Sequence, residues 1–221
     1  MRISLAKYGV KEIVISGIIA VVASIGLVIT GFPWLIIIPL ILFGFILYFF
    51  RDPERVIPPD EQILVAPADG RVIEITEVSE DKFLKEKALK ISIFLSLFDV
   101  HINRAPLSGK VGWQNYTKGK FLVASNPLAS ARNECNEVGL ISGNGGVKIL
   151  LRQVAGIIAR RIVCACAVND SLTKGGRIGM IKFGSRTELY IPLRVVETVL
   201  VKLNDKTRGG ATPLVKIKDI L

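Results

Sequence analysis

The stretch Ile13–Phe50, IVISGIIAVVASIGLVITGFPWLIIIPLILFGFILYFF, carries no charged residue and decides how the chain divides. As one helix it would be about 57 Å long, almost twice the roughly 30 Å hydrocarbon core of a bilayer. A turn signal at Gly31–Pro33 interrupts it and leaves two apolar arms, Ile13–Thr30 and Trp34–Phe50. Each arm is slightly short for a span, so a thin two-span hairpin and a re-entrant anchor both stay open. We therefore predict a membrane-anchoring helical hairpin over residues 1–50.

Cations mark both ends of this stretch and are absent from its turn. Arg2, Lys7 and Lys11 precede the first arm, and Arg51 and Arg55 follow the second. The positive-inside tendency then places both ends, and the rest of the chain, on the cytoplasmic side of the cell membrane. A cleaved signal peptide or a buried core hairpin is the alternative, although a signal peptide would need neither the second arm nor the short turn.

The remaining domain, residues 51–221, is basic. The whole chain has a formal net charge of +10, and residues 1–50 contribute three cations and one anion, which leaves +8 for this domain. Anionic lipid head groups attract such a surface by about 1 kcal/mol per well-placed cation. Because the sequence has no nucleic-acid-binding motif, we expect a lipid surface as partner and no nucleic acid.

The three cysteines, Cys135, Cys164 and Cys166, form an odd set. With a single histidine and no second cysteine pair, a structural zinc site or a disulfide framework is poorly supported. We expect reduced, buried thiols and no metal. In a strand, Cys164 and Cys166 would point the same way.

The chain after Asp52 reads as short strands separated by Gly, Pro and Asn turns, and it has only one good helix candidate, Pro127–Glu137. This pattern predicts a β-rich, sandwich-like or barrel-like domain with one or two short helices. The predicted strands are Arg71–Val78, Leu89–Leu97, Gly146–Leu151, Ile157–Val168, Arg177–Phe183, Arg186–Ile191 and Thr198–Leu203.

Three polar residues in separate turns are candidates for chemistry. His101, the only histidine, follows an apolar strand, Asp69 lies in an Asp-Gly turn, and Ser185 follows Gly184 between two strand-like runs. Singly, each has a plain explanation: a packed imidazole, a turn, a bulge. Together they would supply an orienting carboxylate, a base and a nucleophile, since triads are defined by geometry and not by chain order. The serine lacks the G-x-S-x-G elbow, which disfavours an ordinary hydrolase.

Many blocks in one order resemble the phosphatidylserine decarboxylase proenzymes, in particular their short membrane-associated bacterial and archaeal branch. The resemblance covers most of residues 48–203. Its blocks are Phe50–Arg55, Ala66–Gly70, Phe94–Ser96, Asp99–His101, Asn103–Pro106, Gly119–Phe121, Ala129–Ser130, Asn133–Glu134, Gln153–Gly156, Ala159–Val163 and Arg177–Arg186.

The resemblance implies a zymogen that cuts itself between Gly184 and Ser185 and converts Ser185 into a pyruvoyl group. That group would form a Schiff base with the serine amine of phosphatidylserine and accept the electrons released with CO₂, giving phosphatidylethanolamine. It implies no pyridoxal phosphate and no metal. His101 would be the base that activates Ser185, and Asp69 would hold its tautomer. The two chains would stay associated, and a homo-oligomer is compatible with this.

One departure from the family pattern concerns a second histidine, which longer members carry three positions after the first. Here that position is Arg104, so His101 has no imidazole to share its work. Two rival functions stay open at this point: a membrane-anchored Ser/His/Asp hydrolase with an intact Ser185, and a non-catalytic module that binds anionic lipid. An ether lipid is an open alternative to the ester substrate.

Overall fold

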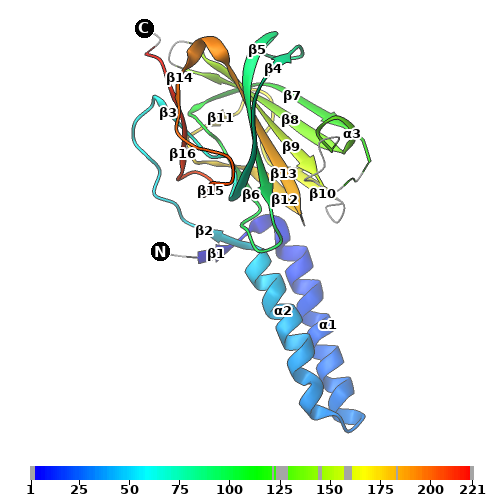
Figure 1. The fold of residues 1–221 in the computed structure, drawn as a ribbon. Helices are drawn as coiled ribbons and strands as arrows, with labels where there is room; N and C mark the ends of the chain where they lie inside the picture. The colour runs from blue at the N-terminus through cyan, green and yellow to red at the C-terminus, as the bar shows by residue number, and fades with distance from the viewer. Residues whose placement is uncertain are drawn as a thin grey trace. The chain divides into compact units, whose positions relative to one another are not determined.

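The computed structural model of the chain describes residues 3–120, 122, 129–143, 146–156, 161–182 and 184–219. They form two compact units, residues 1–54 and 55–221, which are described separately (Figure 1). The predicted blocks at Phe121, Ala159–Arg160 and Phe183, and the start of the predicted helix at Pro127, lie outside the described residues.

The first unit is the predicted helical hairpin. Helix α1 (Val10–Ile29) and helix α2 (Ile37–Phe49) run antiparallel, and the 3-10 helix Pro33–Ile36 leads into α2 (Figure 1). The Thr30 hydroxyl donates to the Gly26 carbonyl oxygen at 2.8 Å and closes α1. Gly31 then takes a φ of +79°, a conformation that favours glycine, so the chain can reverse.

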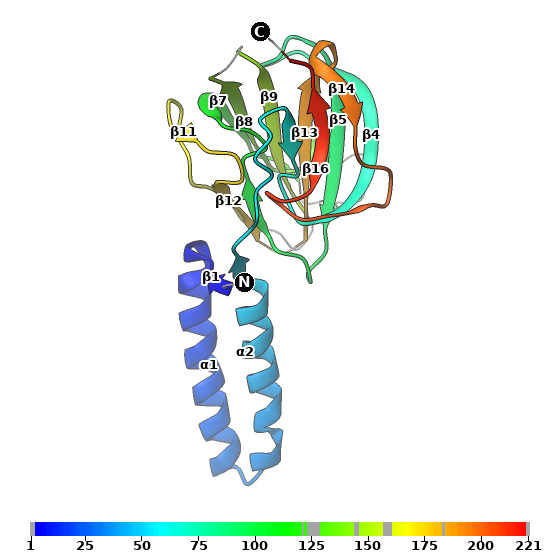
Figure 2. The same ribbon diagram turned by 90° about the vertical axis from the view of Figure 1, so that its left-hand side faces the viewer.

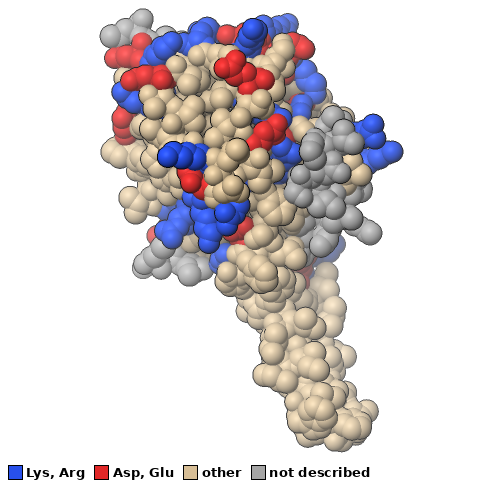
Figure 3. All heavy atoms as spheres, viewed as in Figure 1, with Lys and Arg blue, Asp and Glu red and all other residues tan. Residues whose placement is uncertain are grey.

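Apolar surface dominates the hairpin. Among the described residues one helix, Lys7–Ile29, is long and apolar enough to cross a membrane, and Pro33–Phe49 is a shorter apolar helix. Figure 3 shows neither acidic nor basic side chains over most of the visible hairpin surface. At its open end, strand β1 (Ile3–Leu5) pairs with strand β2 (Arg51–Pro53), after which the 3-10 helix Lys7–Gly9 starts the first arm.

The second unit is built on one eight-stranded antiparallel sheet. Its order is β11-β7-β8-β9-β13-β5-β4-β15, and Figure 2 shows β13 between β9 and β5. The bounds are β4 Gly70–Glu80, β5 Glu86–Leu95, β7 Gly109–Thr117, β8 Cys135–Ser142, β9 Lys148–Ala155, β11 Ser171–Leu172, β13 Ser185–Pro192 and β15 Lys206–Thr207.

Two three-stranded sheets cover the inner face of this large sheet. They are β10-β12-β6 and β14-β16-β3, with bounds β3 Ile63–Val65, β6 Ile102–Arg104, β10 Arg161–Cys164, β12 Arg177–Lys182, β14 Val196–Val199 and β16 Pro213–Ile217. The core lies between them, where Ile93 and Leu189 of the large sheet pack in one cluster with Ile178 and Leu214 of the small sheets. This arrangement confirms the predicted β-rich, sandwich-like domain.

The described helices of this unit are short, as predicted: α3 (Ala129–Arg132) and a 3-10 helix (Leu193–Val195). The predicted helix Pro127–Glu137 is wrong beyond Arg132, because Cys135–Glu137 begin strand β8. Glu137 explains the difference, since its buried carboxylate forms ion pairs with Lys82, in the turn between β4 and β5, and with Arg152 of β9. Such long-range partners override a local preference for helix.

Strand boundaries differ from prediction by a few residues. Ala165–Val168 lie beyond β10 in irregular backbone, and the last predicted strand, Thr198–Leu203, ends at Val199. Cys164 is thus the last residue of β10, and Cys166 lies in the irregular backbone that follows.

Gly179 offers a test of this packing. It pairs with Cys164 across β12 and β10, and a Cβ there would lie 1.9 Å from the Val163 carbonyl oxygen. We expect Gly179→Ala to lower the free energy of unfolding by about 1–3 kcal/mol, as overpacking does. Thermal unfolding in detergent should show a lower midpoint than for Gly143→Ala, where nothing lies within 4 Å. Equal midpoints would contradict the described register.

Candidate active site

Ser185 is the first residue of the central strand β13. It pairs with Leu95 of β5 on one side and Ala155 of β9 on the other. The side chain is fully buried, and its Oγ has no hydrogen-bond partner among the described residues. Immediately before it, Gly184 has a φ of +60° and open space where a Cβ would be. A buried hydroxyl without a partner is costly, and such groups are often kept for chemistry.

His101 contacts Gly184, the residue before Ser185. The imidazole is fully buried in the segment between β5 and β6. The Gly184 backbone N–H donates to its Nε2 at 3.2 Å, and its Nδ1 lies 3.0 Å from the Asp99 carbonyl oxygen. Because a carbonyl only accepts, this pattern assigns the proton to Nδ1 and a lone pair to Nε2. The structure therefore brings His101 and the Gly184-Ser185 bond together.

A side-chain clasp fixes the loop that carries this carbonyl. Asp99 Oδ2 accepts the Ser96 backbone N–H at 2.8 Å and the Ser96 hydroxyl at 2.7 Å. Short polar side chains close turns in this way. The predicted site omitted Ser96 and Asp99, although a Ser and an Asp three residues apart after an apolar strand could have suggested a side-chain-closed turn.

Asp69 lies in the same unit with partners of its own. Its carboxylate forms an ion pair with Arg55 at 2.6 Å and accepts the Gly209 N–H at 2.8 Å. Burial raises the pKa of Asp69 above its ordinary value, while the Arg55 charge and the Gly209 N–H oppose the rise; Asp99 adds to it. The described partner of His101 Nδ1 is the Asp99 carbonyl oxygen, which accepts from it, and the orienting role of Asp69 stays a prediction.

Arg104 occupies the position of the second histidine in longer relatives of the family that the sequence resembles. It is buried, and its Nη1 donates to the Gly175 carbonyl oxygen at 3.0 Å. Its backbone N–H donates to the Pro67 carbonyl oxygen at 2.8 Å. These contacts tie the loop after His101 to the neighbouring turns.

A buried ladder of polar side chains reaches β13 from the inner face. Asn103 donates to Thr187 Oγ1 at 2.9 Å and accepts from Gln153 at 2.7 Å, and Asn136 donates to Gln153 at 2.9 Å. All four residues are buried. The ladder joins β6, β8, β9 and β13, which are distant in sequence, so no local pattern indicated it.

Charged groups hold the opposite face of the same strand. Arg186 forms ion pairs with Glu74 of β4 and, at 3.0 Å, with Glu188 of β13. Glu188 also accepts from the Ser130 hydroxyl at 3.0 Å and from the Tyr190 hydroxyl at 2.7 Å. Both faces of β13 are therefore anchored by polar contacts within a few residues of Ser185.

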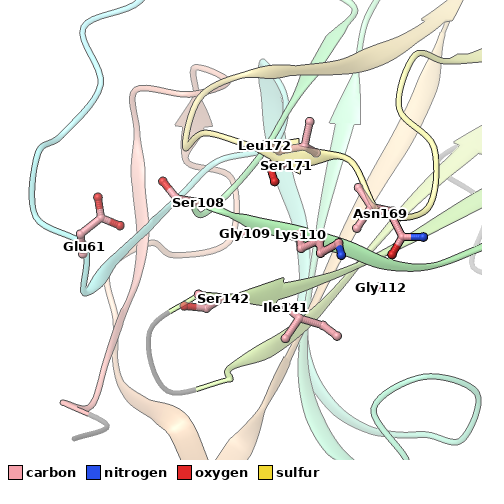
Figure 4. A pocket seen from close by; sticks show the side chains of 12 residues that line it. Glu61, Ser108, Gly109, Lys110, Gly112, Ile141, Ser142, Asn169, Ser171 and Leu172 are labelled. Carbon is pink, nitrogen blue, oxygen red and sulfur yellow. The ribbon is translucent and has the colours of Figure 1, made fainter.

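A cavity of about 810 Å³ lies elsewhere in the unit. Figure 4 shows Ser108, Lys110 and Asn169 among its lining residues, and Ser185, His101 and Asp69 are not in that lining. Within the described ranges, no group of three or more His, Cys, Asp and Glu side chains could hold a metal ion.

Comparison with known proteins gives one consistent result. The family model of phosphatidylserine decarboxylase matches residues 42–215. A phosphatidylserine decarboxylase proenzyme of Carboxydothermus hydrogenoformans is 48% identical over 185 residues, 84% of this chain and 85% of that protein. Proenzymes of the same name from Syntrophus aciditrophicus and Geobacter metallireducens are 40% and 46% identical, covering 95% and 89% of this chain and 96% and 88% of theirs.

The Arg55–Asp69 pair generates a stability prediction. The two side chains are only 6% and 14% exposed, so Arg55→Met leaves a largely buried carboxylate unpaired. We expect a loss of about 3–5 kcal/mol in the free energy of unfolding at pH 7, measured by chemical denaturation in detergent. As a control, Lys216→Met breaks the half-exposed Lys216–Glu197 pair and should cost about 1 kcal/mol or less.

This deficit should depend on pH. Without Arg55, the pKa of Asp69 rises further, because the charge that opposed the effect of burial is gone. Above that raised pKa the folded protein holds an unpaired anion, whereas below the ordinary value of about 4 the carboxyl is neutral in both states. The deficit of Arg55→Met relative to the wild type should therefore shrink as the pH falls from 7 towards 5. A deficit that is constant over this range would show that the ion pair is not its cause.

Proposed function

The chain belongs to the phosphatidylserine decarboxylase family, and on this premise we propose that it cuts itself between Gly184 and Ser185 to become an active lipid decarboxylase. The reaction of the family, loss of CO₂ from phosphatidylserine to give phosphatidylethanolamine, is the function of this lyase. The observation that carries the self-cleavage is the buried Ser185 Oγ, which has no hydrogen-bond partner among the described residues and follows Gly184, whose backbone N–H donates to His101 Nε2.

The contacts around Gly184 support a base-assisted attack. In the first step Ser185 Oγ attacks the Gly184 carbonyl carbon, a C–O bond forms, and the C–N bond to Ser185 breaks. The proton leaves Oγ and ends on the released Ser185 nitrogen. His101 is suited to carry it, because Nε2 holds a lone pair one peptide away and Nδ1–H is fixed by the Asp99 carbonyl.

The second stage removes the new ester. Loss of the Ser185 Cα proton expels the Gly184 carboxylate, and the resulting unsaturated residue takes up water and releases ammonia, which leaves a pyruvoyl group at position 185. That group supplies an electrophilic carbonyl for the substrate amine and an electron sink for the loss of CO₂. Position 185 suits it, because it begins a strand that is paired on both sides and stays fixed after the cut.

The fold supports association of the two products, residues 1–184 and 185–221. After cleavage β13 would remain paired with β5 and β9, β15 with β4, and β16 with β3. The ion pair of Arg186 with Glu74 also crosses the two chains. We infer that the mature enzyme is a non-covalent complex of both chains.

We also propose that the hairpin anchors the enzyme in the cell membrane, with the β-rich unit on the cytoplasmic side. The apolar helix Lys7–Ile29 and the cations at both ends of the hairpin support this. An anchored, basic enzyme stays close to a substrate that never leaves the lipid phase. Asp69, which forms an ion pair with Arg55 in the same unit, is proposed to hold the tautomer of His101, as the resemblance to the family implies.

Ser185→Ala tests the nucleophile. Without Oγ no ester can form, so we expect a full-length chain with no decarboxylase activity, whereas Ser79→Ala, an exposed serine, should be cut and active. Denaturing electrophoresis and release of CO₂ from labelled phosphatidylserine are the measurements. An uncut Ser185→Ala chain with normal decarboxylation would overturn the proposal.

His101→Ala tests the base. Loss of a positioned base typically costs about 10²–10⁴ in rate, so the half-time of processing should lengthen by that factor. Lys110→Ala, which lines the cavity in Figure 4, is the control and should mature at the normal rate. Prompt cleavage of the His101→Ala chain would remove His101 from maturation.

A further inference from the structure

Cys164 and Cys166 lie outside the machinery just described. Their sulfur atoms are 3.6 Å apart, close enough for one thiol to donate a hydrogen bond to the other. Cys164 is partly exposed at the end of β10, and Cys166 is buried in the irregular backbone that follows the strand. The neighbouring residues Ala165 and Ala167–Asp170 are exposed, so a small reagent can approach Cys164.

The two thiols differ in their hydrogen-bond partners and in the direction in which their pKa values are shifted. Gln114 Nε2 donates to Cys164 Sγ at 3.2 Å, which stabilises negative charge on this sulfur. The hydrogen bond from Cys166 and those from the surrounding amides lower the pKa of Cys164, and the same interaction together with burial raises the pKa of Cys166. Cys164 is therefore the better nucleophile and Cys166 the resolving thiol.

The backbone permits a bond between them. The sulfur atoms are 3.6 Å apart and have to approach to about 2.05 Å to form a disulfide. The irregular backbone after Cys164 leaves Cys166 outside the ladder of β10, so side-chain rotation can bring the sulfurs together without unpairing β10 from β12.

We propose that Cys164 and Cys166 form a redox-active dithiol that closes to an intrachain disulfide by exchange with a low-molecular-weight disulfide. The Cys164 thiolate attacks one sulfur of that disulfide, forming a mixed disulfide and releasing one thiolate. The Cys166 thiol loses its proton to water, and its sulfur attacks Cys164 Sγ and releases the second thiolate. The protein loses two electrons, and the small disulfide is reduced to two thiols.

Tryptic mapping can test this on the full chain in detergent. Cleavage after Arg161 and Lys174 gives one peptide, residues 162–174, that contains both thiols and not Cys135. The protein is treated with oxidised glutathione, denatured, and alkylated with N-ethylmaleimide. We expect this peptide to lose both alkylation sites and two hydrogens, while Cys135 remains alkylated. Dithiothreitol should restore both sites.

Matched serine variants distinguish closure from simple oxidation. Cys166→Ser should trap one glutathione on Cys164, Cys164→Ser should leave Cys166 unmodified, and Cys135→Ser should close like the wild type. A wild-type peptide that stays fully alkylated after oxidised glutathione, or that keeps glutathione on Cys164 without closing, would overturn the proposal. The readout is a mass, so it is independent of decarboxylase activity and of cleavage at Ser185.

Discussion

Strand β13 is paired on both sides, and this pairing fixes the position of Ser185. It lies between β5 and β9, and its first residue, Ser185, faces Leu95 and Ala155. On its inner face, Leu189 packs in the core and Thr187 belongs to the polar ladder. On its outer face, Arg186 and Glu188 form a buried ion pair. A serine at the start of such a strand has a fixed position. Gly184, the residue before it, lies outside the strand and has a φ of +60°.

The predicted cleavage bond, Gly184-Ser185, lies directly before the first residue of this rigid strand. Residues after the bond belong to a central strand, and the histidine that contacts Gly184 comes from a loop clasped by Ser96 and Asp99. The Asp99 carbonyl oxygen accepts from His101 Nδ1, so the tautomer of the imidazole depends on the conformation of this loop. Asp69 and Arg55 form a largely buried ion pair in the same unit. Burial raises the pKa of the Asp69 carboxylate, and the charge of Arg55 opposes this rise.

Much of this could be predicted from the sequence where the signal is local. The uncharged run Ile13–Phe50 and the turn at Gly31 predicted the hairpin, and the strand-like run Arg186–Ile191 predicted β13. The helix expected over Pro127–Glu137 failed because the partners of Glu137 lie far away in sequence. The Asp99 carbonyl was missed for a different reason: every residue has one, so residue type carries no sign of its role.

The central claim is that the bond before Ser185 is cut and that position 185 becomes a carbonyl group. Intact mass of the wild-type protein purified from cells, before and after reaction with a hydroxylamine reagent, tests it most directly. We predict two chains, residues 1–184 and 185–221, with the shorter one lacking a free amine at its N-terminus and gaining one reagent adduct. A single uncut chain in a preparation that decarboxylates phosphatidylserine would contradict the account.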